Sequence, residues 1–360
     1  EDVFRIDPLN EEEKYSLVCT PAAALGSCRK KLADPHGDDL SEYEKIFSFF
    51  KRYDIRYFFY IGGNDSMDTV VKLSEYSKDK NYETVFMGVP KTIDNDLMGT
   101  DHTPGFGSAA KYVATVMQEI ACDCSVYTTK AVTIVEVMGR DAGWLTAAAG
   151  LPRILGENTA DLIYLPEVAF DEEKFIADLR KQLEIKPNVV VAVSEGIKTE
   201  SGEYVGEKKQ SGAVDIFGHR YLAGTAKYLE GLVKEKIGCK VRSVELNLPQ
   251  RCASHILSKT DIEESFETGK ISVAFSTRSE TNNGYVTVLR RRDGDGYRVD
   301  YDCVRAENIA NKTKTVPVEM ITDEKNNIKD ELLLQILPLI GGEIAVPTER
   351  GLPKHFKFKK

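Results

Sequence analysis

The order of apolar and polar positions predicts strands and helices in regular alternation over most of the chain. Short apolar runs of strand length alternate with longer segments whose apolar residues recur at helical spacing, such as Val70, Val71 and Leu73. The predicted strands are 57–61, 85–87, 132–138, 162–165, 189–193 and 241–248, and the predicted helices are 66–76, 107–121, 144–151, 172–183 and 221–237. This alternation predicts an α/β fold with a parallel sheet that is covered on both faces.

The pattern changes near Gly284. The runs 285–291 and 297–304 flank Asp293-Gly294-Asp295-Gly296, which favours an antiparallel hairpin with a glycine-rich turn. No internal repeat of roughly 20–50 residues is visible, which argues against a repeat array.

Length and charge narrow the classes of protein. The chain has 360 residues, about the size of two ordinary domains. Its net charge of −9 argues against a nucleic-acid partner. No apolar run approaches the roughly 20 residues of a membrane span, and the acidic start is not typical of a signal peptide. The seven scattered cysteines lack zinc-site spacing, so we expect a reducing cytoplasm.

The run Lys91-Thr92-Ile93-Asp94-Asn95-Asp96 follows a predicted buried strand. Open α/β sheets place their chemistry in loops at the carboxyl ends of strands. Two close carboxylates repel each other unless a cation or a proton intervenes, so Asp94 and Asp96 predict a general base and a magnesium ligand. Lys91 and Thr92 add donors for a phosphate. The same residues would also suit an Asx turn and a helix cap, which need no ligand.

A glycine-rich turn, Gly62-Gly63-Asn64-Asp65-Ser66, joins a predicted strand to a predicted helix. Glycines let a phosphate approach the backbone, and the helix N-terminus attracts the anion. The alternative is a tight turn in which a polar residue caps the helix.

Further candidates stand near other strand ends. In Met138-Gly139-Arg140, the glycine can admit a ligand close to the backbone and the arginine can clamp an anion. Glu167, Arg242 and Arg251 also stand close to strand ends. Taken singly, such charges are usually solvated surface residues.

Together these motifs resemble the phosphofructokinase family. The matching segments follow a consistent order from about Leu25 to Arg251, and the C-terminal third matches only loosely. They are Gly26-Ser27-Cys28-Arg29, Gly62-Gly63-Asn64-Asp65-Ser66, Pro90-Lys91-Thr92-Ile93-Asp94-Asn95-Asp96, Val137-Met138-Gly139-Arg140, Leu165-Pro166-Glu167, and Arg242 with Gln250-Arg251.

The resemblance implies phosphoryl transfer to the 1-hydroxyl of fructose 6-phosphate, a step of glycolysis. By motif position the catalytic residues are Asp94 as the base, Thr92, Lys91 and Arg140, and Mg2+ is held by Asp96 and Asn64. The sugar phosphate is expected at Thr92, Asp94, Met138, Gly139, Arg140, Glu167, Arg242 and Arg251. The phosphoryl donor is expected at Gly62, Gly63, Asn64, Asp65, Ser66, Arg29 and Lys91.

Two residues bear on which phosphoryl donor is used. In ATP-using members of the family the residue at Asp65 is typically glycine, and the one at Lys91 is often glycine too. A carboxylate at Asp65 would crowd and repel the α-phosphate of a nucleotide, whereas Lys91 can neutralise a terminal phosphate of pyrophosphate. The combination favours pyrophosphate, and an ATP-dependent phosphofructokinase is the alternative.

Departures from the family pattern keep a different class of protein open. Asn64 stands in place of a common acid, Leu248 in place of histidine or tyrosine, and Ala131 in place of an arginine that contacts a neighbouring subunit's sugar phosphate. The chain also starts without the family's first strand and Gly-Gly loop, as though it begins inside the first domain. A non-catalytic, sugar-phosphate-binding regulatory subunit would tolerate these changes, but the presence of both Asp94 and Asp96 favours an enzyme.

The resemblance also implies the architecture. We expect two doubly wound, Rossmann-like α/β domains of three layers, with the active site in the cleft between them. The phosphoryl-donor domain would take residues 1–105 and 253–315, and the fructose 6-phosphate domain residues 106–252 and 316–360. Family members associate, so a homodimer or homotetramer is expected.

Overall fold

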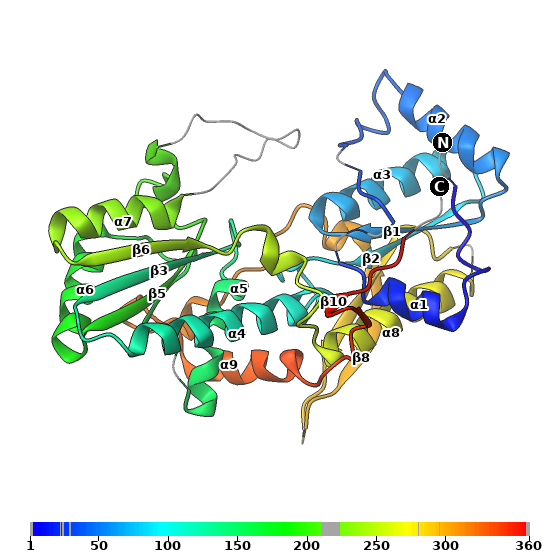
Figure 1. Cartoon of the computed structure of the whole chain (residues 1–360). Coiled ribbons are helices and arrows are strands. Elements are labelled where there is room, and N and C mark those ends of the chain that lie inside the picture. The colour runs from blue at the N-terminus through cyan, green and yellow to red at the C-terminus, as the bar shows by residue number, and fades with distance from the viewer. Residues whose placement is uncertain are drawn as a thin grey trace.

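The computed structural model describes residues 3–21, 23, 25–28, 30–157, 159–209, 224–279, 281–294 and 296–357. Two lobes, each built around a four-stranded sheet, make up the molecule (Figure 1). The α-helices of the described part are α1 (Glu11–Val18), α2 (Ser41–Arg52), α3 (Asn64–Asp79), α4 (Phe106–Ser125), α5 (Trp144–Ala147), α6 (Glu172–Ile185), α7 (Thr225–Lys236), α8 (Lys259–Ser276) and α9 (Asp330–Ile336). The strands are β1 (Tyr57–Gly62), β2 (Val85–Pro90), β3 (Ala131–Val137), β4 (Leu162–Tyr164), β5 (Asn188–Ser194), β6 (Lys240–Glu245), β7 (Tyr285–Arg291), β8 (Val299–Arg305), β9 (Thr348–Glu349) and β10 (Leu352–Pro353).

The first sheet has the strand order β1-β2-β7-β8. β1, β2 and β7 run parallel, and β8 returns antiparallel to β7. The predicted hairpin is therefore confirmed, although β8 begins at Val299 rather than at Tyr297. Asp295 of the predicted turn lies outside the described residues.

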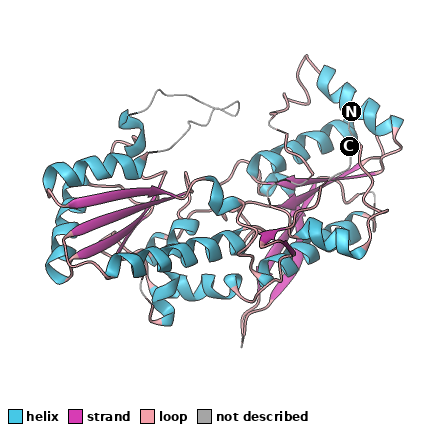
Figure 2. Ribbon diagram, in the orientation of Figure 1, coloured by secondary structure: helices cyan, strands magenta, loops and turns pink. Residues whose placement is uncertain are grey.

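The second sheet has the order β4-β5-β3-β6, and all of its strands are parallel. Figure 2 shows it as a body separate from the first sheet. Alternate residues of β3 face opposite sides, because side chains alternate along a strand. Val135 and Val137 pack with α4 and α9, whereas Val132 and Ile134 pack with α6 and α7. The prediction of parallel strands covered on both faces is confirmed.

The predicted strand 241–248 is too long. β6 ends at Glu245, and Asn247 adopts the unusual backbone angles φ 43° and ψ −136°. Leu248 and Pro249 then begin a short 3-10 helix, Leu248–Arg251. Since proline has no N–H to donate to a neighbouring strand, the chain leaves the sheet there. The predicted helix 221–237 appears as α7 from Thr225, and residues 221–223 lie outside the described part.

Helix α8 was missed because its buried stripe is polar. Asp261, Glu264, Thr268, Ser272 and Ser276 recur at helical spacing on its buried side. A method that follows apolar periodicity finds no helix in such a segment. Those buried polar groups instead hold neighbouring loops: Asp261 accepts hydrogen bonds from the backbone N–H groups of Gly105 and Ser108, at 2.8 and 3.0 Å. α8 thereby fixes the start of α4.

Of the helices in the described residues, none has the length and apolar character needed to cross a membrane.

Candidate active site

The loop from Thr92 to Gly105 connects the carboxyl end of β2 to α4. It closes on itself, because the Thr92 N–H donates to the Pro104 carbonyl at 3.2 Å and the Thr103 hydroxyl donates to the Thr92 carbonyl at 2.8 Å. The Thr92 hydroxyl accepts from the N–H of Asp94 at 3.1 Å. An Asx-like turn is therefore present, but its side-chain acceptor is Thr92 and not one of the two aspartates.

Electrostatic interactions join four of the predicted residues in one site. Burial raises the pKa of Asp94 to about 6, and the neighbouring charge of Asp96 adds to the rise. Lys91 and Arg140 act in the opposite direction, because their positive charges favour the ionised carboxylate. Arg140 comes from the second sheet, so residues from both lobes surround Asp94.

Asn64 and Asp96 meet at the start of α3. The Asn64 side chain hydrogen-bonds to the Asp96 carboxylate, whose pKa is raised chiefly by burial. Oδ1 of Asn64 is buried and has no hydrogen-bond partner among the described residues. A carboxylate beside an unpaired amide oxygen suits Mg2+, which usually takes one or two carboxylates together with water and phosphate oxygens. No cluster of three or more His, Cys, Asp or Glu able to hold a metal occurs in the described part of the chain.

The glycine-rich turn lies beside the Asp-rich loop. The Lys91 N–H donates to the Gly62 carbonyl at 3.0 Å, so the ends of β1 and β2 are joined. Gly63 is the N-cap of α3, and Asp65 lies in the first turn of that helix. A side chain at position 62 would collide with Ser66. Arg29, the remaining predicted donor ligand, lies outside the described residues.

The segment from Met138 to Arg140 has a tightly fixed backbone. Its Gly139 has φ 138°, a conformation that side-chain-bearing residues rarely adopt, and an added Cβ would lie 2.5 Å from the Ala142 carbonyl oxygen. The Met138 N–H donates to Oε1 of Gln250 at 3.1 Å. The Ser194 hydroxyl donates to the Gly139 carbonyl. These bonds fix the backbone of the loop at the end of β3.

Two further predicted residues carry unpaired buried atoms. Nε of Arg140 and Oε2 of Glu167 have no hydrogen-bond partner among the described residues. The other oxygen of Glu167 accepts from the N–H groups of Gly143 at 2.7 Å and Val316 at 2.8 Å, which fixes the carboxylate. Buried polar atoms are normally paired, so such atoms point to a missing ligand or water.

Arg242 and Arg251 differ in their placement. Arg251 follows the buried Gln250 in the short 3-10 helix and is exposed. Arg242 pairs in register with Thr133, well before the carboxyl end of β3. It lines a small pocket with Lys240, at the other end of the sheet from Gly139. Within one chain, the structure does not bring Arg242 to Arg140.

Sequence reasoning missed Glu195. This residue follows β5 and accepts a hydrogen bond from the Gly139 N–H at 3.3 Å. Burial raises its pKa to about 7 against that hydrogen bond, and the charge of Asp94 adds to the rise. The rule that chemistry gathers at strand ends could have found it, because Glu195 lies two residues after the predicted strand 189–193.

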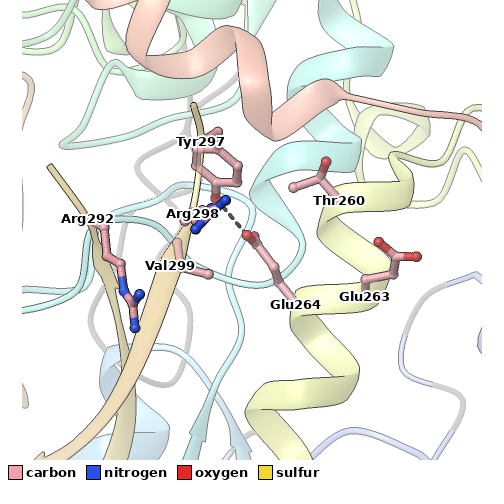
Figure 3. A pocket seen from close by; sticks show the side chains of 7 residues that line it. All are labelled: Thr260, Glu263, Glu264, Arg292, Tyr297, Arg298 and Val299. Atoms are coloured by element: carbon pink, nitrogen blue, oxygen red, sulfur yellow. Dashed lines mark hydrogen bonds between the residues drawn. The ribbon is translucent and has the colours of Figure 1, made fainter. Parts of the chain in front are cut away.

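A separate pocket of about 420 Å³ lies between α8 and the β7–β8 hairpin (Figure 3). The Tyr297 hydroxyl donates to Oε1 of Glu264 at 2.7 Å, and Oε2 of Glu264 bonds to Nε2 of His102 at 2.6 Å. His102 is 3% exposed and bonds to Asp101 through Nδ1 at 2.8 Å. Burial lowers the pKa of His102, but its two carboxylate partners outweigh burial and the pKa is raised. His102 therefore links the loop from Thr92 to Gly105 to α8 through its hydrogen bond with Glu264.

Comparison with known proteins gave consistent matches. The family model described as Phosphofructokinase matches residues 2–256. The Halomonas elongata protein named pyrophosphate–fructose 6-phosphate 1-phosphotransferase is 36% identical over 365 residues, covering 100% of this chain and 85% of the relative. The protein of the same name from Xanthomonas campestris is 39% identical over 347 residues, covering 96% and 82%. A crystal structure of pyrophosphate-dependent phosphofructokinase from Nitrosospira multiformis superposes with a TM-score of 0.85 at 34% identity, covering 97% of this chain and 82% of that one.

Proposed function

Because the chain belongs to the phosphofructokinase family, we propose that it transfers a phosphoryl group from pyrophosphate to the 1-hydroxyl of fructose 6-phosphate, giving fructose 1,6-bisphosphate. The observation that carries the proposal is the grouping of Lys91, Asp96 and Arg140 around the Asp94 carboxylate, whose pKa is raised. Phosphoryl transfer needs a base for the hydroxyl, a metal and positive charge around the phosphoryl group, with little covalent chemistry from the protein.

Asp94 accepts the proton of the sugar hydroxyl. A pKa of about 6 keeps its carboxylate ionised near neutral pH while leaving it a better proton acceptor than an ordinary aspartate. Thr92 holds the backbone of Asp94, and Arg140 balances charge beside it. Asp96 and Asn64 would hold Mg2+, which supplies charge neutralisation for the phosphate oxygens when it is bound.

Pyrophosphate would bind between the Gly62–Ser66 turn and Lys91, with Arg29 as a further ligand. The backbone at the N-terminus of α3 offers N–H groups to an anion. Asp65 in the first turn of α3 would repel the additional phosphate of a nucleotide. The curated relatives named above also carry pyrophosphate in their names.

Fructose 6-phosphate would bind at the ends of β3, β4 and β5. Its ligands there are the backbone of Met138 and Gly139 and the side chains of Arg140, Glu167 and Glu195, and Arg251 is added from the 3-10 helix that follows β6. Arg242 lies toward the end of the second sheet that is opposite to the proposed site of its own chain. We therefore assign Arg242 to the site of a neighbouring copy in a homodimer or homotetramer.

The division of the chain into two domains is also part of this proposal. Residues 1–105 and 253–315 form the phosphoryl-donor domain, and residues 106–252 and 316–360 form the sugar domain. We place the enzyme in the cytoplasm, because all seven cysteines are free in the structure.

The deciding experiment compares pyrophosphate with ATP as donor, using fructose 6-phosphate and Mg2+, and follows fructose 1,6-bisphosphate in a coupled assay. We expect turnover with pyrophosphate at least about tenfold faster than with ATP, because the Asp65 carboxylate would repel the nucleotide; tenfold corresponds to about 1.4 kcal/mol. An equal or faster rate with ATP would overturn the donor assignment. Binding of fructose 6-phosphate by calorimetry with no turnover under either donor would instead indicate a regulatory subunit.

A further inference from the structure

The segment Thr313–Val316 connects the two halves of the proposed site. Thr313 forms an antiparallel bridge with Leu97, and the Lys314 N–H donates to the Asp96 carbonyl at 2.7 Å. On the other side, the Lys314 carbonyl accepts from the indole N–H of Trp144 at 3.0 Å, and the Val316 N–H donates to Glu167 at 2.8 Å. One short segment therefore contacts both the Asp-rich loop and the side of the site assigned to the sugar.

The ammonium group of Lys314 is completely engaged by the loop. It donates to Oδ1 of Asn95 at 3.0 Å, to the Thr100 carbonyl at 3.1 Å and to the Asp101 carbonyl at 2.7 Å. An ammonium has three N–H donors, so none is left for a substrate. The same group lies over the indole ring of Trp144, 5.1 Å from its centroid. Lys314 thus holds protein atoms together rather than binding a ligand.

Among the groups that Lys314 holds, Asn95 is the one that lies between the two aspartates of the proposed site. It separates Asp94 from Asp96, it is 2% exposed, and its φ of 54° lies in the left-handed region. Asparagine adopts that conformation more readily than most residues, but a partner must still hold its buried side-chain oxygen. Lys314 is that partner. The relative placement of the two carboxylates therefore depends on a cation more than two hundred residues further along the chain.

We propose that Lys314 is a positioning residue that fixes the Asp94–Asp96 loop and, through Trp144, sets the place of that loop relative to the sugar-binding residues. The inference deepens the proposed function and rests on it for its kinetic consequence. Phosphoryl transfer depends on alignment of the acceptor, the base and the donor, and a displacement of about 1 Å can cost about a hundredfold in rate. The structural part of the inference stands on the hydrogen bonds alone.

The kinetic test compares Lys314→Met with Lys314→Arg. Methionine keeps the length of the side chain but cannot donate, so we expect kcat to fall about a hundredfold while KM for both substrates changes less than about threefold. Arginine restores donors and should recover at least about a tenth of the wild-type kcat. Lys312→Met is the matched control, because Lys312 is exposed and bonds only to the nearby Asn308 carbonyl among the contacts described; its kcat should stay within about twofold of the wild type. A Lys314→Met enzyme with kcat within about threefold of the wild type would refute the proposal.

The second test does not depend on activity. Hydrogen exchange measured by mass spectrometry should accelerate in residues 92–105 of Lys314→Met, and exchange in β5 should stay unchanged. The fluorescence of Trp144 should also change, because it is the one tryptophan of the chain and loses a cation over its ring. Unchanged exchange in residues 92–105 would overturn the positioning role. Accelerated exchange throughout the protein would also overturn it, because it would show that Lys314 contributes only to overall stability. If the wild type has no activity with pyrophosphate, the proposed function fails while this test still decides the role of Lys314.

Discussion

The carboxylate of Glu195 accepts a hydrogen bond from the backbone N–H of Gly139 at 3.3 Å, which joins the end of β5 to the end of β3. The bond places an acid with a pKa of about 7 beside Arg140 and Asp94. The structure therefore places an additional carboxylate in the proposed site.

The raised pKa of Glu195 predicts how stability varies with pH. Between the ordinary glutamate pKa and about 7 the folded protein retains a proton that the unfolded chain has lost, so stability falls as pH rises through this range. The Glu195→Gln variant does not lose stability in this way. At pH 8 its free energy of unfolding should exceed that of the wild type by at most about 3 kcal/mol, so it should unfold at a higher temperature. The advantage should vanish at pH 4. Thermal unfolding without metal measures this, with the exposed Glu200→Gln as the control that should show no pH-dependent gain.

Replacing Asp94 by serine should remove the base. We expect kcat to fall by roughly 10²–10⁴-fold, since general-base catalysis typically contributes that much. The control is Asp123→Ser, a change at an exposed position of α4. Steady-state kinetics with circular dichroism checks the result, and near-normal turnover in folded Asp94→Ser would remove Asp94 from the mechanism.

Gly139→Ala should weaken fructose 6-phosphate binding. The added methyl group would lie 2.5 Å from the Ala142 carbonyl oxygen, so the loop must move. We expect KM for the sugar phosphate to rise at least about tenfold, equivalent to 1.4 kcal/mol of binding. Gly202→Ala is the control: its φ of 83° is also left-handed, but an added Cβ meets no atom within 4 Å. If Gly139→Ala and Gly202→Ala raise KM equally, the rise comes from backbone strain alone and not from the contact with Ala142.

Asp65→Gly should shift donor preference toward ATP. Removing the carboxylate removes both bulk and negative charge from the first turn of α3. We expect the ratio of ATP to pyrophosphate rates to rise at least about tenfold. Asp65→Asn separates the two causes, because it keeps the size and removes only the charge. A ratio that stays constant in both variants would show that Asp65 does not select the donor.

Arg242 can be tested by mixing two inactive chains. If it serves the neighbouring copy, coexpression of Arg242→Ala with Asp94→Ser should restore about a quarter of wild-type activity, since half of randomly formed dimers are mixed and each has one intact site. Activity of the mixed sample that does not exceed the sum of the separate variants would show that Arg242 acts within its own chain or has no catalytic role.

The buried strands were the most predictable part of this protein. Buried strands in a parallel sheet are continuous apolar runs, and Val85 to Met87 and Val189 to Val193 were recognised for that reason. Helix α8 could not be recognised in this way, because its buried residues are polar and satisfied only by partners from distant segments. The end of β6 was misplaced because Asn247 turns the chain while its neighbours remain apolar.

The sequence by itself determined the alternation of elements, the loops that follow the strands and the residue types in them, because these depend on local periodicity and on the chemistry of single side chains. Only the tertiary structure decided which of those residues meet. Asp94 and Arg140 belong to loops on different sheets, Glu195 is hydrogen-bonded to Gly139 next to Arg140, and Arg242 is kept away by the register of β6. Lys314 has no local signal at all, because its role comes from hydrogen bonds to a loop that is adjacent to it only after folding.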